Sequence, residues 1–199
     1  MKFAIGMPPQ APCALNEPKK LVHSYKVLSL QSAALGGLIL VPLFAWLLWE
    51  ATGINPVKAW FDVPPYQFLG TIFGLIVIHE LAHLLTFPQL GLGSRSYLGF
   101  LPSYMIPYAS HQGPVRRWHH VFTAITPFVL ISIVPTILAF FHPTSLPGML
   151  IGFILLNAFG SGGDLIIATR ALWWTQPGDY VQGEWYGQCV VSPENEETI

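Results

Sequence analysis

Charged residues are scarce in this chain of 199 residues. Lysine, arginine, aspartate and glutamate together make up 10% of it, whereas a soluble domain carries about 25%. The formal net charge is −1, so the chain lacks the basic field that binding to nucleic acid requires. A surface with so few charges is typical of a protein that faces lipid, and we therefore expect an integral membrane protein.

Cysteine is also rare, and the two that are present lie near opposite ends of the chain. Cys13 and Cys189 fall in polar segments and match no metal-binding spacing. They indicate no disulfide framework either. The sequence therefore argues against a small domain held together by disulfides and against a cysteine-ligated metal site.

Apolar sequence is what the chain has in abundance, since 52% of its residues are hydrophobic. Four runs are long enough to cross a bilayer as helices, which takes about 20 residues each. We predict an all-α membrane protein with four transmembrane helices, near residues 28–49, 66–87, 121–141 and 148–173. Most of the tryptophans lie at or near the ends of these runs, where interfacial aromatic residues are expected.

The same pattern predicts the domain organisation. A transmembrane domain over residues 28–174 would follow a flexible N-terminal tail, residues 1–27, and precede a polar C-terminal tail, residues 175–199. The long loop of residues 88–120 is rich in glycine, proline and aromatic residues, and its alternation predicts short strands. We also expect a short hairpin over residues 179–191 in the C-terminal tail.

Lysine and arginine predict the orientation in the membrane, because cytoplasmic loops are enriched in both. Nearly all of them precede the first run, lie in the loop of residues 88–120, or sit near the end of the fourth run; the other two loops contain only Lys58. We therefore expect both termini and the 88–120 loop in the cytoplasm, with the protein in the plasma or inner membrane.

The second apolar run contains the motif His79-Glu80-Leu81-Ala82-His83. Ionisable side chains within a membrane span are costly and are rare without a function. Residues four apart share one face of a helix, so both imidazoles can reach one metal ion. We predict that His79 and His83 bind Zn²⁺ and that Glu80 is a catalytic base that takes a proton from an attacking water. The plainer alternative is a set of structural side chains satisfied by neighbouring helices.

A third ligand is expected, because catalytic zinc usually has three protein ligands. Asp164 is the only carboxylate in the fourth run, and it would lie at a depth comparable to that of the two histidines. Gly160, Gly162 and Gly163 would let another helix approach closely. We predict Asp164 as the third metal ligand, the alternative being an aspartate bonded to backbone or paired with Arg170.

Asn157 lies seven residues before Asp164, so two helical turns place both on one face. It could orient a substrate carbonyl or brace the metal ligands. We predict a catalytic role for it, and the alternative is a purely structural role. Three further histidines, in or just after the long loop, are weaker candidates for contact with the metal: His111, His119 and His120.

These motifs together resemble a known family. The HELAH motif in the second of four spans, RRW…TPF at the start of the third and N…GGD in the fourth resemble the Putative zincin peptidase family of small membrane proteins. More distantly, the arrangement is similar to site-two-type intramembrane metalloproteases, in which an HExxH helix and a later aspartate hold zinc. The resemblance covers roughly residues 66–186. It departs from the site-two pattern of Leu-Asp-Gly, because Gly163 precedes Asp164 and Leu165 follows it.

The sequence therefore favours zinc-dependent hydrolysis of peptide bonds near the cytoplasmic face, on a protein or peptide substrate that could itself be membrane-anchored. Two alternatives stay open. A membrane di-iron lipid oxidase would need more suitably placed histidines than this chain offers. A non-catalytic scaffold would close a structural metal site with a fourth protein ligand, His111 or His119.

Overall fold

The computed structural model describes residues 2–6, 11–102, 106–142 and 146–189. The chain divides into two compact units, each described here by itself. The helical unit consists of Lys26–His79 and Ile125–Ile166, and the sheet unit consists of Met1–Tyr25, Glu80–Ala124 and Ile167–Ile199. Some helices contribute residues to both units, because the boundaries fall inside continuous helices rather than in loops.

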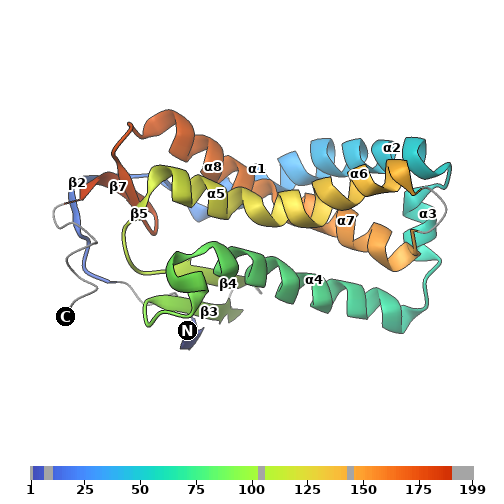
Figure 1. The fold of residues 1–199 in the computed structure, drawn as a ribbon, viewed down its shortest axis with the longest axis horizontal. Coiled ribbons are helices and arrows are strands. Elements are labelled where there is room, and N and C mark those ends of the chain that lie inside the picture. The colour runs from blue at the N-terminus through green and yellow to red at the C-terminus, as the bar shows by residue number, and fades with distance from the viewer. Residues whose placement is uncertain (1, 7–10, 103–105, 143–145, 190–199) are drawn as a thin grey trace. The chain divides into compact units, whose positions relative to one another are not determined.

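Helices account for most of the described chain (Figure 1). In chain order they are α1 (Tyr25–Leu35), the π-helical turn η1 (Gly36–Leu40), α2 (Val41–Thr52), α3 (Pro56–Phe61), α4 (Pro65–Thr86), the short 3-10 turn η2 (Pro88–Gly91), α5 (Arg117–Phe128), the π-helical turn η4 (Val129–Ile133), α6 (Val134–Phe141), α7 (Gly148–Gly160) and α8 (Gly162–Trp174). Within the helical unit, α2 packs against α6 and α7, and α3 packs against α7. Leu48, Ile151 and Ile154 are fully buried in the core that results.

Local sequence signals mark the end of α2 and the start of α3. Gly53 follows α2 with a left-handed φ of 68°, and its N–H donates to the Trp49 carbonyl at 2.7 Å. A residue without Cβ adopts this conformation at no steric cost. At the start of α3, the Asn55 side chain accepts a hydrogen bond from the Lys58 N–H at 3.0 Å, as an N-cap does.

Both π-helical turns lie just before a proline. The turn η1 ends two residues before Pro42, and η4 ends two residues before Pro135. A proline inside a helix has no N–H to donate, and its ring collides with the carbonyl four residues earlier. A wider turn relieves that collision, so these two prolines account for the position of the π segments.

Gly36 is required for the close packing of η1 against α7. A Cβ at this position would overlap the backbone carbonyl of Phe159, whereas a Cβ at Gly37 would make ordinary contact with the Phe159 ring at 3.6 Å. We therefore expect Gly36→Ala to lower the free energy of unfolding by about 1–3 kcal/mol through overpacking. The matched Gly37→Ala should be neutral or slightly stabilising, since alanine favours helix. Unfolding of both variants in detergent micelles measures the difference, and equal stability would contradict the packing.

Three continuous helical segments are long and apolar enough to cross a membrane: residues 25–52, 65–86 and 117–141. Helices α7 and α8 count as a fourth only if they are taken together, because they are bent by 43° at Ser161. The single helix expected over residues 148–173 is therefore broken. Large apolar side chains on these segments are widely exposed, as a lipid-facing surface requires; examples are Leu30, Leu38, Phe73 and Phe141.

The sheet unit contains two small β-sheets. In the three-stranded sheet, β3 (Ser96–Leu101) lies between β1 (Lys2–Ile5), which is parallel to it, and β4 (Ile106–His111), which is antiparallel. The four-stranded sheet has the order β2 (Leu15–Lys20), β7 (Trp185–Cys189), β6 (Tyr180–Gln182) and β5 (Val115–Arg116), with antiparallel neighbours.

These sheets correct the prediction of an all-α protein, because the described chain is mostly helical but mixed. The short strands predicted in the loop of residues 88–120 are confirmed as β3 and β4, and the predicted C-terminal hairpin is confirmed as β6 and β7. The segment expected to be an N-terminal tail carries β1 and β2. Their partners lie far along the chain, so no local pattern reveals the pairing. Residues 190–199 of the expected C-terminal tail lie outside the described residues.

Candidate metal centre

Helix α4 carries the HELAH motif without interruption. Its regular geometry places His79 and His83 one turn apart on one face. Glu80 follows His79 directly and is 9% exposed. An apolar helix that buries a carboxylate must compensate for the cost of removing it from water, so the surroundings of Glu80 and the two histidines decide what the motif can do.

Asp164 lies in the first turn of α8, and its Oδ2 is 3.2 Å from Nε2 of His79. Zinc bonds of about 2.0–2.2 Å put tetrahedral ligands about 3.3–3.6 Å apart, so this pair lies close to the spacing of two ligands of one ion. One turn along α4, His83 completes a group of three whose possible ligand atoms all lie within 4.8 Å of one another. The side chains of His79 and Asp164 are 14% and 24% exposed, so an ion or a water molecule can reach them.

Asn157 of α7 orients the His79 ring. Its Oδ1 lies 2.8 Å from Nδ1 of His79, and its Nδ2 donates to the Pro127 carbonyl at 3.1 Å and to Ser132 Oγ at 2.9 Å. Because Nδ2 supplies both donated bonds, Oδ1 is the acceptor and His79 Nδ1 carries the proton. With Nδ1 bonded to Asn157, Nε2 is the nitrogen that faces Asp164 and that could share a metal ion with its carboxylate.

His83 is oriented in the same way by a backbone carbonyl. Its Nδ1 lies 2.9 Å from the carbonyl oxygen of Thr123 in α5. A carbonyl can only accept, so Nδ1 carries the proton and Nε2 is the atom that can bind metal. Pro127 stands four residues after Thr123 and has no N–H, so it cannot make the helical bond that would otherwise take this carbonyl. Both rings therefore present Nε2, as metal-binding histidines braced by a second hydrogen bond do.

A comparison with known families falls on the same residues. Residues 72–178, more than half of the chain, match the family described as Putative zincin peptidase. The chain belongs to this family. No curated protein and no solved structure matches it. The matched segment contains the HELAH motif, Asn157 and Asp164. Two imidazoles and one carboxylate are a donor set that zinc takes at open catalytic sites, so these residues fit the metal that the family name implies.

Two of the other candidate histidines, His111 and His119, bond to groups outside this cluster. His119 Nε2 donates to the Thr86 carbonyl at the end of α4, and His111 Nδ1 lies 3.2 Å from Ser96 Oγ. Burial, followed by the nearby charges of Arg95 and His119, lowers the pKa of His111 to about 4, so this ring is neutral at pH 7. Among the described residues, the group of possible metal ligands consists of His79, His83 and Asp164 alone.

Three contributors to the candidate metal centre were not expected from the sequence: the Thr123 carbonyl, Pro127 and Ser132. In the sequence, Pro127 stands out only as part of the RRW…TPF element at the start of the third apolar run. A signal was nevertheless present, because a proline releases the carbonyl four residues before it, and in a membrane span a polar partner must take it up. Four residues before Pro127 is Thr123.

Proposed function

We propose that this chain is a membrane-embedded zinc metallopeptidase. The observation that carries the proposal is the grouping of His79, His83 and Asp164 with both imidazoles turned to present Nε2. Zinc bound by these side chains would polarise the scissile carbonyl and lower the pKa of a water ligand towards about 7. The test is the zinc content of the purified protein together with its hydrolysis of peptides, compared between the natural chain and ligand variants.

Glu80 is the proposed general base. It follows His79 on α4 and is largely shielded from solvent. Its carboxylate takes the proton from the attacking water and then delivers it to the leaving amine, so the two carboxylates of the site have different roles. Asp164 binds the metal ion, whereas Glu80 transfers a proton.

Asn157 acts on His79 in this proposal and does not contact the substrate. Its side chain is 1% exposed, and both its amide oxygen and its amide nitrogen are bonded within the helical unit. A side chain so enclosed has no face left for a substrate carbonyl. The role expected from the sequence is therefore narrowed from catalysis to positioning of a metal ligand.

The proposed substrate is a protein or peptide, which could be anchored in the same bilayer. Most lysine and arginine residues lie at one set of helix ends, and the metal ligands are expected near the same ends. Cytoplasmic segments are enriched in these residues, which supports a site near the cytoplasmic face and both termini on that side. A helical substrate hides its carbonyls in its own hydrogen bonds, so the segment to be cleaved must be extended when it reaches Glu80.

Replacing Pro127 by alanine tests how the His83 ring is held. The new N–H of residue 127 would bond the Thr123 carbonyl and compete with Nδ1 of His83, and losing such a partner typically weakens metal affinity by about 10–100-fold. The matched control is Pro135→Ala, which removes a second proline of the same span, four residues after Ile131. Zinc titration of the metal-free proteins in detergent measures both affinities, and equal affinity in Pro127→Ala and in the natural chain would show that the Thr123 bond does not matter.

A further inference from the structure

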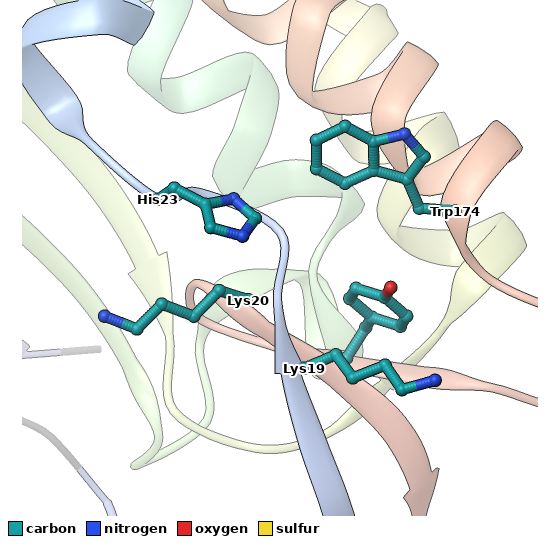
Figure 2. A pocket seen from close by; sticks show the side chains of 5 residues that line it. Lys19, Lys20, His23 and Trp174 are labelled. Carbon is teal, nitrogen blue, oxygen red and sulfur yellow. The ribbon is translucent and has the colours of Figure 1, made fainter.

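A hollow lies in the sheet unit, built entirely from residues outside the proposed metal centre. It has a volume of about 530 Å³ and is lined by Lys19, Lys20, His23, Trp174 and Tyr186 (Figure 2). Pockets of about 300–1,000 Å³ are of the size that holds small ligands. None of its five lining residues is acidic, so its chemistry is that of a cationic and aromatic site.

Among the described residues, no ion pair neutralises the positive charge of the lysines at this hollow. Neither Lys19 nor Lys20 takes part in an ion pair within the part of the chain that the structure describes. The Lys20 ammonium lies 4.9 Å from the centre of the Trp185 ring, a contact that leaves its charge intact. The two lysine chains leave the strand in opposite directions, as adjacent residues of a β-strand do (Figure 2). They therefore add positive charge on both sides of β2 beside the hollow.

The opposite wall is aromatic and is fixed in place. The rings of His23 and Trp174 meet edge to face, with centroids 5.9 Å apart and an interplanar angle of 77°. Arg170 lies over the same indole, 5.3 Å from its centre, and donates to the Leu21 carbonyl at 3.2 Å. This arginine ties the end of α8 to the segment that follows β2, so the hollow is preorganised.

The position of the hollow in the chain indicates its ligand. Trp174 is the last residue of α8, and His23 lies two residues before the candidate span that begins at Tyr25. Ends of membrane helices lie at the level of the lipid headgroups, where tryptophan and tyrosine are enriched. The proposed cytoplasmic orientation would place the hollow at the leaflet that is rich in anionic lipid.

We propose that this hollow binds the phosphate of an anionic phospholipid headgroup. Lys19 and Lys20 neutralise the phosphate, His23 donates a hydrogen bond to it, and Trp174 and Tyr186 contact the glycerol region. The bound lipid would hold the start of α1 and the end of α8 at one depth in the membrane. This site is independent of the metal centre, so it stands or fails separately from the proposed peptidase activity.

The experiment uses the full chain in a neutral detergent, titrated with phosphatidylglycerol or with phosphatidylcholine of the same acyl chains and followed by native mass spectrometry. The double variant Lys19→Gln/Lys20→Gln is expected to bind phosphatidylglycerol about tenfold or more weakly, with weak binding of phosphatidylcholine unchanged. The matched double variant Lys2→Gln/Lys58→Gln removes the same charge elsewhere and should behave as the natural chain does. Lys19→Arg/Lys20→Arg keeps the charge and should restore binding.

Equal weakening in the two glutamine double variants would reduce the effect to net charge and would overturn the site. Unchanged affinity in the Lys19→Gln/Lys20→Gln protein would overturn it as well. A third arm adds inorganic phosphate or a soluble glutamate-rich peptide to the lipid-bound protein. Displacement of phosphatidylglycerol by either at comparable concentration would assign the hollow to a soluble anion or to a protein partner, and the assignment to lipid would be wrong.

Discussion

Replacing Glu80 by glutamine is expected to reduce peptide hydrolysis by about 10²–10⁴-fold, the contribution that a positioned general base usually makes. Glutamine has nearly the same shape and can keep a hydrogen bond at this place, but it cannot accept the proton of the attacking water. Glu80 lies within the continuous helix α4 and is not one of the three grouped candidate metal ligands, so zinc should stay bound. Turnover of a peptide and zinc per chain, measured on the same sample, give the two numbers needed.

The matched control is Glu50→Gln, which makes the same change at an exposed position in the last turn of α2. It should hydrolyse peptide as fast as the natural chain. If Glu80→Gln retains full turnover, the base lies elsewhere. If it loses zinc together with turnover, Glu80 acts through the metal and its assigned role in proton transfer is wrong.

Replacing Asp164 by alanine is expected to abolish tight zinc binding and, with it, hydrolysis. The carboxylate lies 3.2 Å from His79 Nε2, and two imidazoles alone leave zinc short of the three protein ligands of a catalytic site. The loss should exceed the roughly 10–100-fold that removal of a residue bonded to a ligand costs. Metal analysis after gel filtration, followed by zinc titration of the metal-free protein, measures it.

Asp62→Ala provides the control for this experiment, because Asp62 is an exposed aspartate at the end of α3. That variant should keep about one zinc per chain. Zinc binding that survives in Asp164→Ala would remove Asp164 from the centre. Two irons per chain in the natural protein would instead favour the oxidase alternative raised by the sequence.

The sequence was sufficient for the parts of the fold that rest on local patterns. Apolar runs of sufficient length predicted three helices that are long and apolar enough to cross a membrane, and alternation predicted β3 and β4. It was insufficient where pairing joins distant segments: Lys2 lies opposite Tyr97, and Lys20 lies opposite Trp185. Nothing within residues 1–27 encodes those partners, because a strand at the edge of a small sheet takes its stability from the neighbour it meets after folding.

The candidate site shows the same division. His79, His83 and Asp164 were recognisable from residue type and spacing, and Asn157 from its position two turns before Asp164. The hydrogen bond from His83 to the Thr123 carbonyl was not recognisable from the sequence, because backbone acceptors carry no sequence signature. Only the rule that proline releases the carbonyl four residues earlier points to it, and that rule does not say which neighbour will use the oxygen.

Pro127 does more than bend the helix, because it leaves the Thr123 carbonyl available to His83. Within a membrane span, few solvent molecules would be available to accept the Nδ1–H of a buried imidazole such as His83. A soluble metalloenzyme can use an aspartate there, but another negative charge at this depth would itself be costly. The imino acid creates a neutral acceptor out of the main chain, and it does so without adding a single polar side chain to the span.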